Sequence, residues 1–181
     1  MRILRAADRK ASPWKNGGGV TWEVAASPAG APLDDFEWRV SLAEVASPGP
    51  FSRFPGIDRI LTVIRGQGLS LAVEGLGATA LGASSAPYAF PGDIAATAAL
   101  SDGPIRDLNV MTRRGRWAAQ VRRMSGPVAP KLTAETVILV ALTPLDVGDA
   151  HLSPEDAILF EGAVPPPIGE GAFVLVELHR A

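Results

Sequence analysis

Cysteine is absent from this chain of 181 residues, and histidine occurs only twice, at His151 and His179. Without cysteine the chain has no disulfide bonds, no thiolate metal ligands and no cysteine nucleophile. Neither histidine lies in a recognisable nucleophile context, so no Ser-His-Asp triad is predicted. Isolated histidines of this kind are typical of a surface or of a hydrogen-bonded core. The missing residue types exclude several common kinds of active site.

The sequence also lacks any run of about 18 apolar residues, which is close to the length that a membrane-spanning helix needs. Its start, Met1 to Lys10, alternates charges and contains no apolar core of the kind found in signal peptides. The net charge is −2 and no basic stripe stands out, which disfavours nucleic acid and anionic membranes as partners. We therefore expect a cytoplasmic protein.

Glycine and proline are abundant and spread throughout, with 19 Gly and 16 Pro separating short runs rich in Val, Ile, Leu and aromatic residues. This pattern is typical of many short strands closed into a sandwich or barrel, and no long stretch has a helical period. The fold class is therefore all-β, and Ser153–Asp156 forms either one helical turn or a simple turn. The expected strands are Val20–Ala25, Glu37–Val45, Asp58–Ile64, Leu69–Glu74, Ala86–Phe90, Ile105–Thr112, Trp117–Met124, Thr136–Leu142, Ala157–Phe160 and Ala172–Leu178.

A weak internal repeat divides the chain into two barrel-like halves, residues 1–114 and 115–181. A strand that begins near a tryptophan, an aliphatic strand, an aromatic phrase ending in glycine and a last strand follow one another in both halves. The matching segments are Trp38–Ser41 with the strand from Trp117, 60–64 with 137–140, 86–92 with 156–162, and 108–113 with 173–180. The second half is shorter, and we predict that it packs on the first.

Several phrases are more specific than a generic β-protein requires. They are Pro13-Trp14-Lys15-Asn16-Gly17-Gly18-Gly19, Phe36–Ala43, Phe51–Arg59, Phe90-Pro91-Gly92-Asp93 and Asp107-Leu108-Asn109-Val110-Met111. In this order and spacing the chain resembles the HutD/Ves family, most closely between residues 13 and 113.

The resemblance implies an all-β bicupin, that is, tandem cupin-like (RmlC-like) β-barrels or jelly rolls. HutD proteins are associated with bacterial histidine utilisation. The resemblance therefore implies a regulator or ligand sensor for a small carboxylate such as formylglutamate or urocanate. Ves proteins are described as stress-induced.

The metal-binding motifs of ordinary cupins have no counterpart here. Their first motif supplies His-x-His and Glu, and their second supplies a further His. The corresponding stretches, residues 51–66 and 92–109, contain no histidine, and the first contains no glutamate. Arg59 falls close to the position of the lost glutamate, and a guanidinium has no lone pair for a metal. We therefore predict neither a metal nor another cofactor.

Polar residues alternate with apolar ones along three of the expected strands. Arg39 and Ser41 share one face of their strand, Asp107 and Asn109 share one face of another, and Thr21 shares a face with Glu23. In a closed barrel one face points inward. These polar rows either face water or line a pocket.

If they line a pocket, Arg39 and Arg59 bind carboxylates of a small anionic metabolite. The neutral groups then supply hydrogen bonds, and Asp107 orients an arginine or binds a polar group. The glycine-rich loop from Lys15 to Gly19 is either an anion-binding nest or a tight turn. The predicted ligand-binding residues are Lys15, Asn16, Thr21, Arg39, Ser41, Arg59, Asp107 and Asn109.

The leading hypothesis is a metal-free, small-molecule binding protein that regulates histidine utilisation. Asp58, Asp93 and Asp107 leave a metal-independent enzyme open, such as an isomerase or hydrolase, although their spacing does not demand catalysis. A stress-response interaction module is the third hypothesis. The second half, which carries few charges after Met124, completes the core or forms a homodimer surface.

Overall fold

The computed structural model describes residues 1–14, 17–130, 134–162 and 165–181. The chain divides into two compact units. The first barrel is Lys10–Arg116, and the second barrel combines Met1–Arg9 with Trp117–Ala181. Apart from one turn of 3-10 helix, η1 (Ala6–Asp8), the regular elements within the described residues are strands.

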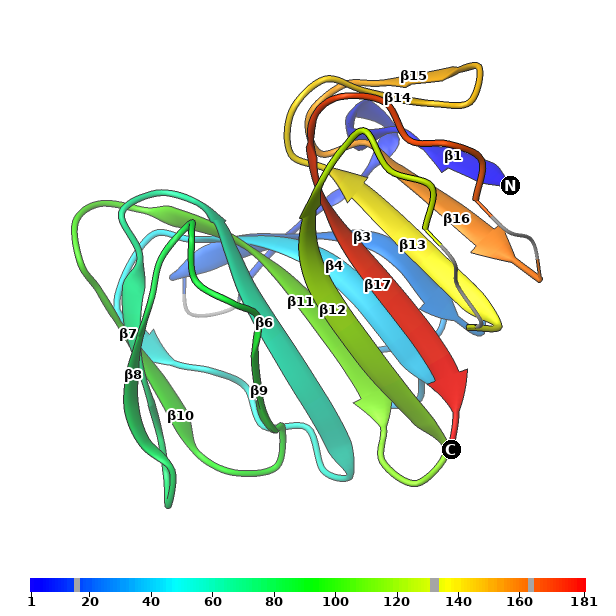
Figure 1. Cartoon of the computed structure of the whole chain (residues 1–181). Helices are drawn as coiled ribbons and strands as arrows, with labels where there is room; N and C mark the ends of the chain where they lie inside the picture. The colour runs from blue at the N-terminus through cyan, green and yellow to red at the C-terminus, as the bar shows by residue number, and fades with distance from the viewer. Residues whose placement is uncertain (15–16, 131–133, 163–164) are drawn as a thin grey trace. The chain divides into compact units, whose positions relative to one another are not determined.

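The first barrel consists of two antiparallel sheets that face each other (Figure 1). The larger sheet has the order β2-β3-β4-β11-β6-β9, and the smaller has the order β5-β10-β7-β8. The strands are β2 (Ala11–Pro13), β3 (Gly19–Ser27), β4 (Trp38–Val45), β5 (Gly49–Pro50), β6 (Ile57–Arg65), β7 (Leu69–Val73), β8 (Gly77–Leu81), β9 (Tyr88–Pro91), β10 (Ala96–Leu100) and β11 (Ile105–Arg113).

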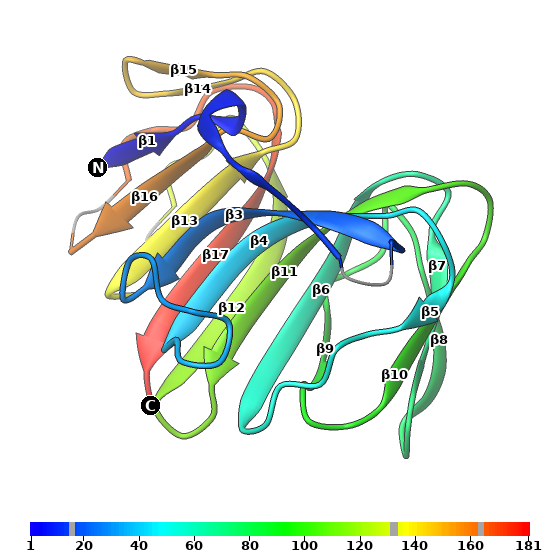
Figure 2. The ribbon, with the colours of Figure 1, turned by 180° about the vertical axis from the view of Figure 1, so that it is seen from behind.

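The second barrel has a five-stranded antiparallel sheet and a two-stranded hairpin. The sheet has the order β1-β16-β13-β17-β12, and β14 pairs with β15 (Figure 2). The strands are β1 (Arg2–Leu4), β12 (Trp117–Ser125), β13 (Thr136–Ala141), β14 (Leu145–Val147), β15 (Ala150–Leu152), β16 (Ala157–Glu161) and β17 (Ala172–Arg180).

Alternating burial explains how the first barrel closes. Along β7, Leu69, Leu71 and Val73 are buried while the two residues between them are exposed, as expected for a strand with one face inward. They pack against buried side chains of the larger sheet, among them Val63 and Ile105. The residues of β6 and β11 that share the face of Val63 and Ile105 therefore point into the barrel.

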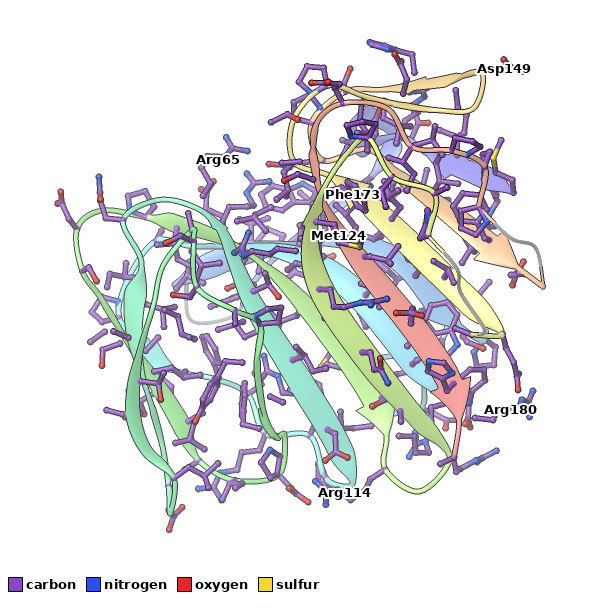
Figure 3. All side chains as sticks on the ribbon, viewed as in Figure 1. Arg65, Arg114, Met124, Asp149, Phe173 and Arg180 are labelled. Carbon is purple, nitrogen blue, oxygen red and sulfur yellow. The ribbon has the colours of Figure 1, made fainter. Side chains whose placement is uncertain are left out.

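The two barrels repeat the same strand order. The run β4-β11-β6-β9 of the first corresponds to β12-β17-β13-β16 of the second, in the pairing that the sequence repeat indicates. In the second barrel the two-stranded hairpin β14-β15 stands in place of the four-stranded sheet of the first barrel. Its core includes Phe160 and Phe173, and Phe173 lies opposite Met124 on the paired strand β12 (Figure 3). The all-β, tandem cupin-like fold predicted from the sequence is confirmed.

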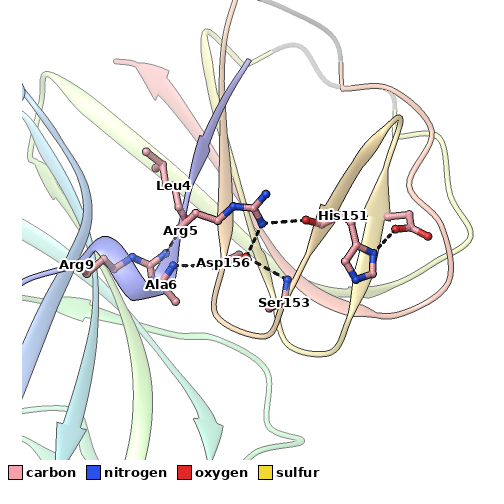
Figure 4. A network of polar contacts seen from close by, with 8 residues as sticks. Leu4, Arg5, Ala6, Arg9, His151, Ser153 and Asp156 are labelled. Carbon is pink, nitrogen blue, oxygen red and sulfur yellow. Dashed lines mark hydrogen bonds and ion pairs between the residues drawn. The ribbon is translucent and has the colours of Figure 1, made fainter.

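The N-terminal segment, Met1–Arg9, belongs to the second barrel, whereas the sequence repeat predicts residues 1–114 as the first half. Strand β1 pairs with β16, with Ile3 opposite Ile158. The buried carboxylate of Asp156 then clamps the segment: it accepts hydrogen bonds from Arg5 Nη1 at 2.8 Å and from the Ala6 amide at 2.7 Å (Figure 4). The internal sequence repeat does not predict with which strand a short terminal segment pairs.

The Ser153–Asp156 segment is a simple turn rather than a helical turn. The amide of Ser153 donates to Asp156 Oδ2 at 3.1 Å, and the amide of Asp156 donates to the Ser153 carbonyl at 3.0 Å. The Asp156 side chain is thus committed to the N-terminal clamp as well as to its own turn.

Candidate functional site

A cavity of 590 Å³ lies inside the first barrel, on the inward face of its larger sheet. This volume is within the range of small-molecule sites in proteins. Strands β3, β4, β6 and β11 supply its polar wall, and the segment between β5 and β6 supplies aromatic rings. The lining residues are Ser12, Pro13, Trp14, Thr21, Leu33, Arg39, Ser41, Ala43, Pro50, Phe51, Ser52, Phe54, Arg59, Asp107, Asn109 and Met111.

Two buried arginines stand on this wall, one on each side of strand β11. Arg39 on β4 and Arg59 on β6 are both paired with Met111 of β11, so the three residues form a row across the sheet. The exposed fractions are 8% for Arg39 and 7% for Arg59. The Nε atom of each guanidinium is buried and has no hydrogen-bond partner within the described residues. Such donors are costly to bury unless another group accepts their hydrogen bonds.

Arg59 is held among aromatic rings. The centre of its guanidinium lies 5.1 Å from the ring centroid of Phe51, 5.7 Å from that of Phe54 and 5.2 Å from that of Phe90. Its Nη1 also donates to the carbonyl of Ser52 at 3.3 Å. Burial lowers the pKa of Arg59 to about 10, opposed by the charge of Asp107, so the guanidinium stays protonated at neutral pH.

A chain of hydrogen bonds runs from Arg59 into the barrel. Arg59 Nη2 donates to Asn109 Oδ1 at 2.6 Å, and Asn109 Nδ2 donates to Asp107 Oδ1 at 2.7 Å. Asp107 has no exposed surface, and its Oδ2 has no partner within the described residues. Burial raises the pKa of Asp107 to about 7, although the charge of Arg59 and the hydrogen bond from Asn109 oppose this rise.

Arg39 has a different partner, Glu23 on the neighbouring strand β3. The pairing of β3 with β4 shifts between Glu23 and Ala25, and Glu23 stands opposite Ser41. Glu23 Oε2 then lies 3.2 Å from Arg39 Nη2, one diagonal step along the sheet. The register of β11 against β6 also shifts, between Arg106 and Asp107, next to the buried carboxylate of Asp107. Bulges often occur beside functional sites because they re-aim side chains.

Six of the eight residues predicted to bind a ligand line this one cavity, which brings together side chains from four strands. They are Thr21, Arg39, Ser41, Arg59, Asp107 and Asn109. Of the three polar rows, Arg39 with Ser41 and Asp107 with Asn109 are buried, whereas Thr21 and Glu23 are half-buried. Thr21 is already engaged, since its Oγ1 accepts a hydrogen bond from Trp14 Nε1 at 2.7 Å. That the six bind a ligand stays a prediction.

The other two predicted residues, Lys15 and Asn16, lie outside the described residues. In the same loop Gly19 sits where backbones approach closely, because a Cβ there would lie 2.3 Å from the carbonyl oxygen of Glu44. Gly17 has φ +70°, a conformation that favours glycine. Backbone conformation and close packing therefore explain why glycine occurs at these two positions. The hypothesis of an anion-binding nest stays open.

Sequence reasoning missed the aromatic side of the cavity. Phe51 and Phe54 flank Arg53, an exposed residue that does not line the cavity. The phrase Phe-Ser-Arg-Phe carried a usable signal, because two aromatic residues three apart in a turn-rich segment can contact one partner together. The role of Glu23 was also missed, although its parity with Thr21 already placed it on the inward face.

The acidic residues considered for catalysis separate into two places. Asp58 and Asp93 lie outside the cavity, where both accept hydrogen bonds from Arg114, which directly follows β11 (Figure 3). The bidentate hydrogen bond from Arg114 holds the pKa of Asp93 down at about 2. Asp58 therefore pairs with Arg114 rather than with its sequence neighbour Arg59. Asp107 alone of the three reaches the cavity wall.

Metal-ligand clusters and membrane-spanning helices would indicate other kinds of site. Among residues 1–14, 17–130, 134–162 and 165–181, no group of three or more His, Cys, Asp or Glu side chains is placed to hold a metal ion. Within the same ranges no helix is both long and apolar enough to cross a membrane.

Fold and cavity together define a tandem cupin-like protein with an arginine-containing pocket in its first barrel. The model of the HutD family matches residues 6–172, and this chain belongs to that family. The resemblance found in the sequence is thus confirmed. A 21.2 kDa protein from the region 3′ of hutC in Pseudomonas putida is 38% identical over 141 residues, or 78% of this chain and 73% of that protein. The Ves protein of Citrobacter koseri is 42% identical over 60% of this chain and 56% of its own length.

Solved structures show the same relationship. HutD from Pseudomonas fluorescens SBW25 superimposes with a TM-score of 0.87 at 34% identity, covering 99% of this chain and 98% of its own. A conserved protein from Pseudomonas aeruginosa PAO1 gives a TM-score of 0.86 at 36% identity over 98% of each chain.

Proposed function

We propose that this protein binds a small carboxylate in the first-barrel cavity and acts as a metal-free regulatory protein in histidine utilisation. Formylglutamate and urocanate are the candidate ligands. The observation that carries the proposal is the pair of buried arginines, Arg39 and Arg59, each with an unpartnered Nε–H on the wall of one cavity within the described residues. A buried guanidinium selects a carboxylate by charge and by its planar fork of donors.

The setting of the arginines favours an anion over a neutral ligand. The rings around Arg59 exclude water, and a charge attracts an anion more strongly where water is excluded. The relative from the hutC region supports a link to histidine utilisation. A cytoplasmic location is part of the proposal.

A thermal-shift screen tests this function. Formylglutamate, urocanate, glutamate and histidine are added to the full chain, with the methyl ester of each acid as its matched control. A ligand that binds the folded state raises the melting temperature in proportion to the logarithm of its concentration. We expect at least one free acid to raise the melting temperature and its ester to leave it unchanged. If no acid shifts the melting temperature at millimolar concentration, the proposal is wrong.

A metal-independent enzyme is a second candidate, favoured by one observation. A buried carboxyl with a pKa near 7, as at Asp107, has the property of a general acid or base. Incubating the protein with each ligand from the screen and following the mixture by NMR separates the two functions. Unchanged ligand spectra over many hours support a binding protein, and a product spectrum supports an enzyme.

Substituting Gly92 by alanine is expected to disturb the site although Gly92 itself does not line the cavity. A Cβ at this position would lie 2.9 Å from the carbonyl oxygen of Ile57 and 3.1 Å from Cγ of Arg59. The stem of Arg59 must then move, so we expect about a tenfold loss of affinity and a cost of about 1–3 kcal/mol in stability. Calorimetric titration and urea unfolding measure the two effects. Gly82→Ala is the control, since its Cβ meets no atom closer than 3.7 Å; equal effects of both variants would refute this account.

A further inference from the structure

We infer that the first-barrel cavity binds its anion together with a proton, and that Asp107 takes up this proton. Asp107 is then a positioning residue that acts on the ligand through Asn109 and Arg59. The inference rests on the proposed function, because it assumes that the ligand is an anion held by the arginines.

The geometry ties the three side chains into one unit. Arg59 offers only donors, so Asn109 must present its oxygen to Arg59 and its amide nitrogen to Asp107. Asp107 therefore fixes the orientation of Asn109, which in turn fixes that of Arg59. Asp107 itself is sealed from solvent, and its Oδ2 is left without a partner within the described residues. Burial without a partner for this oxygen disfavours the ionised form of Asp107.

The charges around Asp107 come from every strand of this wall. Arg39 on β4 is paired with Glu23 on β3, and Arg106 on β11 is paired with Glu44 on β4. Arg59 on β6 is the cation whose charge acts most strongly on Asp107, and the charge of Arg106 acts less strongly. Within the part of the chain that the structure describes, the segment of the cavity wall from Pro50 to Phe54 adds no charged lining residue.

These charges balance differently in the two protonation states. With Asp107 ionised, its charge offsets that of Arg59, as Glu23 offsets Arg39, and these described residues together carry no net charge to attract an anion. With Asp107 protonated, the pocket keeps one positive charge in excess. An anion therefore binds the protonated form more tightly, and by reciprocity bound anion raises the pKa of Asp107.

The pKa of Asp107 makes this coupling relevant at neutral pH. Because burial raises that pKa to about 7, the free protein contains both protonation states near neutrality. The ligand shifts the balance toward the protonated state. Affinity is therefore high below this pKa and declines as the pH rises through it.

The test is the Kd of formylglutamate for the full chain, measured by calorimetry between about pH 6 and about pH 8.5. Both carboxyl groups of this ligand stay ionised over the whole range, so its own titration does not contribute. If only the protonated form binds, the Kd rises about 30-fold across the range. Asp107→Asn imitates the protonated carboxyl, so its Kd is expected to stay flat and close to the low-pH value of the wild type. Asp58→Asn, which lies outside the cavity, keeps the wild-type pH dependence.

The outcomes separate this inference from the proposed function. A wild-type Kd that stays flat across the range, or a D107N variant that keeps the slope, overturns the inference alone. If formylglutamate and the other screened acids bind at no pH, both fail. Should D107N not fold, carbon-13 NMR of the aspartate carboxyls of the wild type decides. One aspartate carboxyl must have a pKa near neutrality, and that pKa must rise when the ligand binds. If no carboxyl behaves in this way, the inference is wrong.

Discussion

Replacing Arg59 by methionine is expected to weaken formylglutamate binding by at least about 100-fold, because the ligand loses a charged, bidentate partner in a site shielded from water. Methionine preserves much of the apolar stem that packs among Phe51, Phe54 and Phe90. Calorimetric titration of the wild type and the variant measures the loss. Arg59→Lys keeps the charge but not the planar fork of donors. The affinity of R59K for formylglutamate should therefore fall between those of the wild type and R59M.

Arg53→Met is the matched control for Arg59→Met. Arg53 precedes Phe54 in the same segment but is exposed and does not line the cavity. Its substitution should leave the Kd unchanged. The account is contradicted if R59M binds as tightly as the wild type, or if R53M loses as much affinity as R59M. If R59M fails to fold while R59K folds and binds normally, the arginine is structural and not a ligand anchor.

Replacing Asp156 by alanine is expected to lower the free energy of unfolding by about 2 kcal/mol, since donors to a buried carboxylate lose their acceptor. The side chain is buried, and it accepts hydrogen bonds from Arg5, from the amide of Ala6 and from the amide of Ser153 (Figure 4). The substitution leaves these donors without their acceptor, while the pairing of β1 with β16 is kept. Urea unfolding at neutral pH measures the effect.

The pH dependence of the same contact has a definite sign. Burial opposes ionisation of Asp156, but the hydrogen bonds from Ala6, Arg5 and Ser153 outweigh it and hold its pKa below the usual value. A lowered pKa stabilises the fold above the unfolded-state pKa of about 4, and this stability is lost as the pH falls through the folded-state value. The difference in stability between the wild type and D156A should therefore shrink in acid.

Asp146→Ala serves as the control for Asp156→Ala. Asp146 is exposed and pairs only with exposed His151 in the contacts described, at 2.7 Å, so its loss should leave the unfolding free energy nearly unchanged. If D156A and D146A are equally stable, the hydrogen bonds of Asp156 to the N-terminal segment contribute nothing to the free energy of unfolding. A truncation that removes residues 1–9 is expected to destabilise the chain at least as much as D156A, because it also removes the pairing of β1 with β16.

The long strands could be predicted from the sequence because their side chains carry the signal. All ten expected strands are present, with ends that differ by up to two residues. The missed strands lack that signal. β8 and β10 are built from Ala, Thr, Leu and Gly, and β-propensity is low for alanine and glycine. β1, β2, β5, β14 and β15 are two or three residues long, and tertiary pairing rather than local sequence defines them.

The polar wall of the cavity could be predicted because strand parity is strict. Arg39 and Ser41 share a face in any strand, as do Asp107 and Asn109, and register then brings Asn109 opposite Ser41. The hydrogen bond from Asn109 to Asp107 follows the same alternation within one strand. The aromatic enclosure of Arg59 could not be predicted this way, since Phe51 and Phe54 lie in a segment without periodic structure. The pairing of Glu23 with Arg39 is a diagonal contact that depends on the register of β3 against β4, which the sequence does not state.

A crystal structure of the protein with saturating formylglutamate shows directly whether the first-barrel cavity is the ligand site. We expect the ligand inside the first barrel, with a carboxylate within hydrogen-bonding distance of Arg59 and with Arg39 contacting the same molecule. We also expect that Asn109 keeps its hydrogen bonds to Arg59 and Asp107. Ligand density outside the first barrel, or an empty cavity in crystals grown at a concentration that saturates the protein in solution, would contradict the proposed ligand site.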